Sequence, residues 1–362
     1  MNSQNQTVTK HYPWLDLVRF IAAFIVVISH SLMVFIPEYE DLPPANQNIL
    51  IRGFMFLAKQ GHFAVLCFFI LSGFFVGGKT MEKIANQSFS WKSYSIDRSV
   101  RILLPLLSSL VLTFVVNTYL GIYHSSGSYF GNLLSLQGIV CEPVNGVLWS
   151  LSYEVWCYVI MLGIGIIYSN KSTQTWGGRE IGILILISCF IVFTKLSVVY
   201  LFVWLLGLFC YKMHQKQMFS SITNSKRFIV LIILVMAIID AIVKIKYSYL
   251  FIRYMGELIF SFLFSLIVLF LLKHEPQTYI QKKCEYWGNQ LAKFSYTLYL
   301  SHYPILLLIN SVFPKGENFN TYSLSLWFGS TLISLAVSYL SYLMAEKHTY
   351  AVKTLIRKKI RL

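Results

Sequence analysis

Two basic residues interrupt the first long apolar segment, DLVRFIAAFIVVISHSLMVF (16–35). Arg19 and His30 are eleven residues apart, and eleven steps of about 100° return to within about 20° of the same helix face. A helix here would place them on one side, about 16 Å apart along its axis. Ionisable groups in an apolar helix need a wet cavity or a partner, so both are candidates for chemistry. The alternatives are an Arg19 that extends to the lipid headgroups and a His30 that is a satisfied core histidine.

A carboxylate lies at a comparable depth in the segment NGVLWSLSYE (145–154), which ends at Glu154. A carboxylate beside an imidazole orients the ring and raises its basicity, the arrangement that prepares a general base. We therefore expect Glu154 to orient His30. The alternative is a carboxylate near a helix N-terminus, where the helix dipole favours it.

Cations suited to phosphate occur in two further stretches. In RSVRILLP (98–105), Arg98 and Arg101 are one helical turn apart, and two guanidinium groups at this spacing can hold a phosphate. In FFILSGFFVGGK (68–79), Lys79 follows Ser72 and Gly73, small residues that let a backbone or a thin ligand approach closely. The alternatives are membrane orientation by basic residues and ordinary helix packing.

The acid/base candidates lie deeper than these cations. FSYTLYLSHYPILLL (294–308) adds His302 near the middle of an apolar segment, with Tyr299 one turn before it. The pattern indicates a polyanionic ligand that docks at the cationic end and extends a reactive arm into the protein. A coenzyme A thioester has that shape.

Composition determines what must position these groups. The chain of 362 residues is 56% hydrophobic and 12% charged, about half the charged fraction of a soluble protein. Long apolar runs without apolar/polar alternation predict an all-α, polytopic membrane bundle of about ten transmembrane helices. We expect these helices over 14–36, 55–76, 101–123, 147–168, 181–194, 196–211, 228–243, 251–272, 294–313 and 324–344.

The distribution of basic residues indicates an orientation. With both termini cytoplasmic, the inner segments hold 22 Lys and Arg residues and the outer segments hold seven, as the positive-inside rule requires. The net charge of +15 therefore indicates a membrane partner, and we expect no nucleic acid. Residues 181–211 could form one long helix or two short ones, and the choice reverses the orientation of everything after them.

The remaining features point to one membrane domain. We expect a single unit over 1–362, with no appended soluble domain. Six scattered cysteines show no metal-binding spacing, so we expect no metal. The loop 124–146 has no Lys or Arg and is rather apolar, so part of it is expected to dip back into the outer leaflet.

Five motifs occur here in the order typical of one family. They are R-x10-H from Arg19, F-F-x-x-S-G-F, R-x-x-R-x-x-x-P, W-S-L-S-x-E and S-Y-x-L-Y-L-x-H-x-P. On these motifs the sequence resembles bacterial membrane acyltransferase family 3, the O-acyltransferases that modify surface polysaccharides. The resemblance implies functional roles for Arg19, His30, Arg98, Arg101 and Glu154. The family's closing E-x-P pattern is absent, because Lys347 and His348 follow Glu346.

The resemblance also implies an activity. An acyl-CoA, most commonly acetyl-CoA, would enter from the cytoplasm, and its acyl group would pass to a hydroxyl of a surface or lipid-linked saccharide. His30 would act as general base or carry the acyl group itself; both routes stay open. Arg98, Arg101, Lys79, Ser72 and Gly73 would bind the donor. Trp149, Ser152, His302 and Tyr299 would contact the acceptor.

The expected setting is the cytoplasmic membrane of a bacterium. Membrane lipid surrounds the protein there, and a polysaccharide biosynthesis complex is a further candidate partner. An exporter of polysaccharide or lipid-linked sugar is the competing hypothesis, since buried polar groups could also line a transport path. An exporter has no need of a CoA site at Arg98 and Arg101, which separates the two hypotheses.

Overall fold

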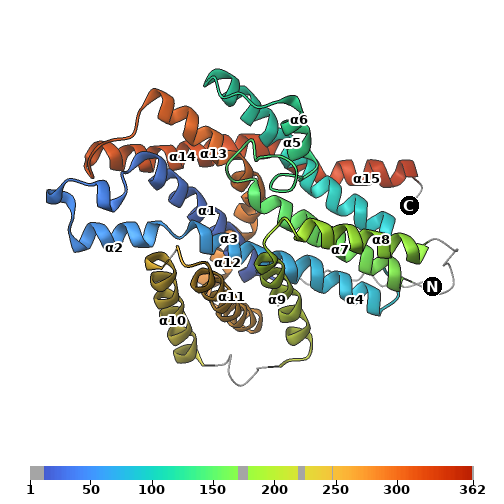
Figure 1. The fold of residues 1–362 in the computed structure, drawn as a ribbon. Coiled ribbons are helices and arrows are strands. Elements are labelled where there is room, and N and C mark those ends of the chain that lie inside the picture. The colour runs from blue at the N-terminus through green and yellow to red at the C-terminus, as the bar shows by residue number, and fades with distance from the viewer. Residues whose placement is uncertain (1–11, 170–177, 219–224, 247, 361–362) are drawn as a thin grey trace.

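The computed structural model describes residues 12–169, 178–218, 225–246 and 248–360, and they form a bundle of helices (Figure 1). No strand occurs among these residues; the backbone makes one isolated bridge, between Gln137 and Cys141. The predicted all-α fold is confirmed. Eight helical stretches are long and apolar enough to cross a membrane, so the chain is an integral membrane protein.

Every predicted membrane segment corresponds to a helix. These are α1 (Pro13–Phe35), α3 (Gly61–Ser72) with its continuations η3 (Gly73–Gly78) and α4 (Lys79–Ala85), α5 (Trp91–Tyr119), α7 (Trp149–Tyr168), α8 (Gly178–Phe193), α9 (Val198–Gln215), α10 (Lys226–Ile245), α11 (Leu250–Lys273), α13 (Ser295–Val312) and α14 (Thr321–Met344). The short α8 and the more polar α13 are not among the eight stretches, so the count of ten crossings stays a prediction. α8 and α9 are two separate helices, which resolves the choice left open for 181–211.

Other helices lie outside the predicted segments, except that the end of α2 overlaps the start of 55–76. They are α2 (Ile49–Ala58), α6 (Ser126–Leu133), α12 (Tyr279–Ala292) and α15 (Thr349–Ile360), together with the short η1 (Tyr39–Asp41), η2 (Pro44–Asn46) and η5 (Glu346–His348). Figure 1 shows α2 and α15 at opposite ends of the bundle, and we name the two ends after them. Arg357 anchors α15 to α5 through Asp97, at 3.0 Å between Nη2 and Oδ2.

The loop between α6 and α7 folds back along α7. The Ser152 hydroxyl donates to the Gln137 carbonyl at 2.6 Å, and the Trp156 indole N–H donates to the Ser135 carbonyl at 3.3 Å. Trp156 lies two turns into α7, and Ser135 and Gln137 are both buried. Protein donors thus satisfy these buried carbonyls, as buried backbone requires. The expectation that part of this loop dips into the outer leaflet stays a prediction.

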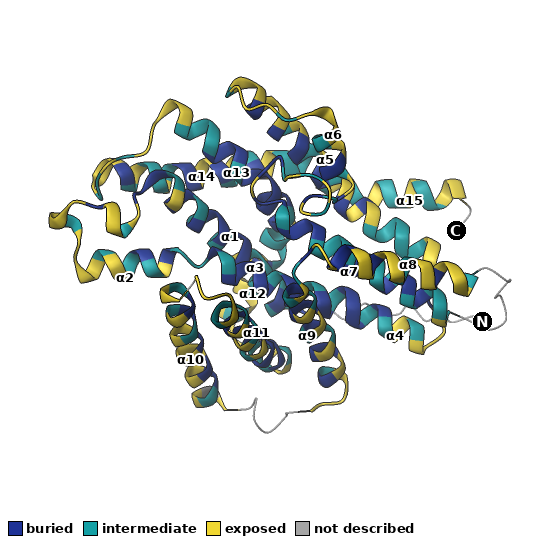
Figure 2. Ribbon diagram, viewed as in Figure 1, coloured by how far each residue is buried: buried dark blue, intermediate teal, exposed yellow. Residues whose placement is uncertain are grey.

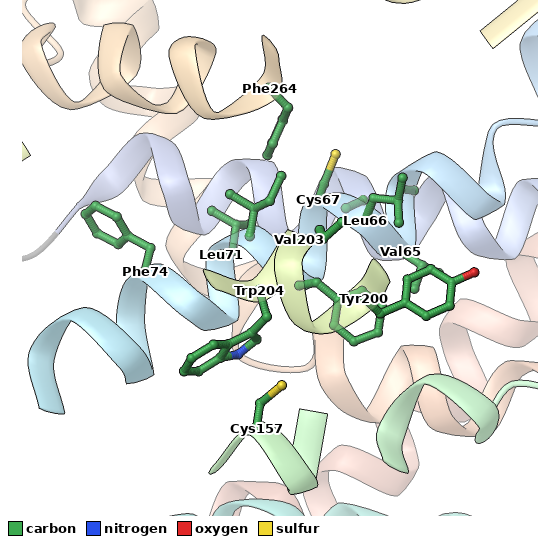
Figure 3. Close-up of a cluster of buried hydrophobic side chains, with 14 of the residues drawn as sticks. Val65, Leu66, Cys67, Leu71, Phe74, Cys157, Tyr200, Val203, Trp204 and Phe264 are labelled. Atoms are coloured by element: carbon green, nitrogen blue, oxygen red, sulfur yellow. The ribbon is translucent and has the colours of Figure 1, made fainter. Parts of the chain in front are cut away.

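The core is built on close contact between α9 and the segment α3–η3. A Cβ placed on Gly73 would lie 1.9 Å from the Trp204 carbonyl oxygen, and one on Gly207 would lie 2.0 Å from that of Ile70. The two backbones therefore touch at their glycines, as small residues permit in membrane bundles. Trp204 is buried, and its indole lies between the η3 segment and Cys157 of α7 (Figure 3).

The outer surface of the bundle is apolar. Burial concentrates where the helices cross, while α10 displays a mixture of buried and exposed faces (Figure 2). Exposed side chains on α10 include Val230, Leu234 and Ile238. A helix that is apolar on its exposed side is suited to lipid.

Candidate active site

A histidine pair joins α1 and α13 in the middle of the bundle. His30 Nδ1 lies 2.8 Å from His302 Nε2, and the two rings stack with centroids 5.2 Å apart and planes 10° apart. The other nitrogen of His302, Nδ1, lies 3.0 Å from the Leu298 carbonyl one turn earlier on α13. His302 is fully buried, whereas His30 is partly exposed.

These partners assign the proton on each ring. A carbonyl oxygen only accepts, so His302 Nδ1 donates to Leu298. In a neutral ring the other nitrogen is then an acceptor, so His302 Nε2 accepts from His30 Nδ1. A neutral His30 consequently carries its free lone pair on Nε2. The pair therefore holds His30 in the tautomer that a general base needs.

A cavity of about 300 Å³, the cation-lined cavity, opens between α1, α3, α5, α7 and α13. Its lining includes Arg19, Lys79, Arg98 and Arg101, with Asp16 and Glu154 as the acidic groups. Four cations against two carboxylates leave a formal excess of two positive charges. Such a cavity favours an anion, and guanidinium groups suit phosphate in particular.

Aromatic rings position these cations. The guanidinium carbon of Arg19 lies 4.8 Å from the Phe75 ring centroid, and the Lys79 ammonium lies 5.6 Å from the same ring. Arg19 also pairs with Asp16 at 3.2 Å between Nη1 and Oδ1. One ring thus holds two cations in reach of the cavity, since cations are drawn to aromatic faces.

The two arginines of α5 keep unused hydrogen-bond donors. Arg98 lies 5.9 Å from the Tyr158 ring centroid, and its buried Nε has no hydrogen-bond partner among the described residues. Arg101 is exposed, and the ion pairs of the described part of the chain do not include it. Both can therefore donate to a bound anion.

Glu154 differs from the expectation that it orients His30. Its carboxylate accepts a hydrogen bond from the Tyr158 hydroxyl one turn along α7, and that hydroxyl also lies 3.0 Å from the Ser72 hydroxyl. The i,i+4 spacing on one helix brings Glu154 and Tyr158 together, while the packing of α13 on α1 gives His30 a different partner. Glu154 is a wall residue of the cation-lined cavity, beside the arginine that Tyr158 supports.

The two small residues expected to bind the donor have different surroundings. Ser72 lines the cavity and accepts from the Trp204 indole at 3.1 Å. Gly73 faces α9 instead, because a Cβ placed on it would lie 1.9 Å from the Trp204 carbonyl oxygen. The backbone of α9 occupies the space beside Gly73, and its expected contact with the donor stays a prediction.

Tyr299 closes the cavity toward the histidine pair. It lines the cavity, and its ring centroid lies 6.2 Å from that of His302. Its hydroxyl donates to the Val147 carbonyl at 3.0 Å and shares a 2.6 Å hydrogen bond with Ser150. His30 is not among the lining residues. The sequence predicts a ligand whose reactive arm extends to the deeper acid/base residues, and in this structure the cavity reaches Tyr299, beside His302, but not His30.

Trp149 and Ser152 lie apart from the pair. Trp149 stacks on His62, with ring centroids 6.3 Å apart and planes 16° apart. The Ser152 hydroxyl is committed to the loop carbonyl of Gln137. The structure thus brings His302 to His30 and Tyr299 to His302, and gives the other two predicted acceptor contacts different partners. The role of Tyr158 was missed, although its spacing from Glu154 could have indicated it.

The fold and the cavity define a class: a helical membrane protein with a buried histidine pair beside an anion-binding cavity. A family model described as an acyltransferase domain matches residues 12–343. The chain therefore belongs to acyltransferase family 3. Neither the curated proteins nor the solved structures compared with the chain give a match. The match establishes a membrane acyltransferase.

Proposed function

We propose that the protein transfers an acyl group, most commonly acetyl, from cytoplasmic acyl-CoA to a hydroxyl of a surface or lipid-linked saccharide. The α15 end would face the cytoplasm of a bacterium. The observation that carries this proposal is the hydrogen-bond chain that leaves Nε2 of His30 as the free base. His30 lies on α1, the helix that also brings Arg19 to the cation-lined cavity.

The donor would bind with its phosphates at Arg98, Arg101 and Lys79. The excess of positive charge at the cavity supports this assignment, because phosphate groups pair best with guanidinium and ammonium donors. The pantetheine arm would then extend past Ser72 toward Tyr299. Displacement of the Tyr299 ring would bring the thioester to His30.

The chemistry is a single exchange of bonds. His30 Nε2 takes the proton of the acceptor hydroxyl as the oxygen attacks the thioester carbonyl. A carbon–oxygen bond forms, the carbon–sulfur bond breaks, and the proton passes from His30 to the CoA thiolate. General-base assistance of this kind contributes about 10²–10⁴-fold in rate. Transfer through an acyl group carried on His30 is the other route, and a burst of one acyl group per protein would identify it.

The test compares surface glycans from cells with and without the protein by mass spectrometry. We expect a mass increment of one acyl group that requires the protein and disappears in His30→Ala at unchanged protein level. Purified protein should also be stabilised against heating by CoA. Wild-type-like acylation by His30→Ala would contradict the proposal, and so would an absence of CoA stabilisation.

A further inference from the structure

A second cavity, the Tyr303 cavity, lies beyond the histidine pair. It has a volume of about 180 Å³, and its lining includes Asn117, His124, Asn145, Gly146 and Tyr303. Asn117 is sixteen residues beyond Arg101 on α5, which is about 24 Å at 1.5 Å per residue. The two cavities therefore open at opposite ends of α5.

One helix forms a wall of both cavities. Tyr296 and Tyr299 of α13 line the cation-lined cavity, while Tyr303, Pro304 and Leu307 of the same helix line the other. His302 falls between these two sets. The histidine pair thus lies at the partition between an anion-binding cavity and a second cavity.

Tyr303 itself separates the second cavity from the base. Its ring meets the His30 ring edge-on, with centroids 5.6 Å apart and planes 74° apart. On its other side a Cβ on Gly146 would lie 3.0 Å from the Tyr303 ring, so the glycine leaves just enough room for the ring. A rotation of this one side chain would join the cavity to His30.

The chemistry of the lining differs from that of the donor cavity. The described lining residues include none of Asp, Glu, Lys or Arg, so nothing there favours a phosphorylated ligand. Asn117 is 3% exposed; its amide donates to the Tyr129 hydroxyl at 3.3 Å and to the Val144 carbonyl at 3.2 Å. These two hydrogen bonds of the side chain use only its nitrogen, so its amide oxygen Oδ1 is open to a donor from a ligand. Neutral polar groups beside aromatic rings suit a sugar ring.

We propose that the Tyr303 cavity binds the sugar residue of the acceptor saccharide and presents its hydroxyl to His30. This inference rests on the proposed acyl transfer and assigns its acceptor site. Asn117 accepts from a sugar hydroxyl, His124 stands at the rim, and Tyr303 moves aside when the sugar enters. The donor and acceptor then approach His30 from opposite ends of the bundle.

The experiment places one cysteine at the rim of the cavity in intact cells. His124→Cys is the test variant and Tyr123→Cys its matched control, because Tyr123 is 89% exposed and is not part of the lining. Both carry Cys141→Ser, which removes the partly exposed thiol of the same loop region. A bulky membrane-impermeant maleimide is added from outside, and glycan acylation is measured by mass spectrometry.

We expect both cysteines to be labelled. Labelling should lower acylation at least tenfold for His124→Cys and less than twofold for Tyr123→Cys. CoA should still stabilise the labelled, purified His124→Cys protein against heating, since the donor cavity lies at the other end of α5. Gly146→Val should also lower acylation without changing CoA stabilisation, because its side chain would press on Tyr303.

Three results would overturn the inference. The first is that the reagent does not label His124→Cys from outside. The second is that labelling of His124→Cys leaves acylation unchanged. The third is that labelling of His124→Cys removes CoA stabilisation together with acylation. If any of these results occurs while the Cys141→Ser protein without an added cysteine acylates glycans and binds CoA, the acceptor site alone is wrong. If the wild-type protein neither acylates glycans nor binds CoA, both the acceptor site and the proposed function are wrong.

Discussion

His30 Nδ1 and His302 Nε2 lie 2.8 Å apart although 272 residues separate them in the chain. The contact makes the fully buried His302 a positioning residue, because it fixes which nitrogen of His30 is free. A carboxylate in that place would also stabilise a protonated His30. A neutral imidazole orients the ring without a buried negative charge, which is costly at membrane depth.

We expect His302→Phe to lower the turnover rate at least tenfold, or about 1.4 kcal/mol in the activation free energy. The phenyl ring fills similar space but cannot accept the proton of His30 Nδ1, so the His30 ring loses its orientation. The KM for acyl-CoA should not change. His302→Gln, whose amide oxygen can accept, should recover part of the rate. Steady-state kinetics on purified protein measure the turnover rate of each variant and its KM for acyl-CoA.

Ser301→Ala is the control for this change. It removes a buried hydrogen bond on the same helix, to Ser338 at 2.8 Å, and leaves the histidine pair intact. If Ser301→Ala slows turnover as much as His302→Phe, or if His302→Gln recovers nothing, the positioning role is wrong and α13 matters only for stability.

Removing either α5 arginine should weaken donor binding. A charge-assisted hydrogen bond contributes about 1.5–3 kcal/mol, so Arg98→Ala or Arg101→Ala should raise the KM for acyl-CoA about tenfold or more. The wild-type affinity should fall with added salt, as screening requires. Lys92→Ala is the matched control, because Lys92 lies on the same helix, 5.7 Å from the Trp91 ring, and does not line the cavity. Equal effects of Lys92→Ala and Arg98→Ala would contradict a specific phosphate site.

Glu154→Gln should separate the two roles considered for this residue. The amide oxygen still accepts from Tyr158, and removing one of two carboxylates raises the formal excess of positive charge in the cavity from two to three. We therefore expect an unchanged or lower KM for acyl-CoA and an unaltered pH dependence of the turnover rate. Rates measured across pH check this. A displaced pH profile would favour the sequence-based expectation that Glu154 orients the base.

The sequence predicted which cations line one cavity better than how the deeper polar residues pair. The apolar runs locate the helices because length and hydropathy alone set what can cross a bilayer. Arg19, Lys79, Arg98 and Arg101 share a cavity as expected, since all lie near the same end of their segments. The partner of His30 was not predictable, because it depends on how α13 rotates against α1. Glu154 and His302 both occupy suitable depths, and only packing selects between them.

The contact between Gly73 and α9 gives a prediction about stability. A Cβ at Gly73 would lie 1.9 Å from the Trp204 carbonyl oxygen, and a backbone atom cannot move aside as a flexible side chain can. We expect Gly73→Ala to destabilise the protein by about 1–3 kcal/mol, the usual cost of overpacking. Gly53→Ala on α2 is the control, because nothing lies within 4 Å of its Cβ position. The readout is the midpoint of thermal unfolding in detergent, with the yield of folded protein beside it. Equal midpoints for the two variants would mean that α9 can shift away from η3. A Gly73→Ala protein of normal stability that fails to bind CoA would instead support a contact between Gly73 and the donor.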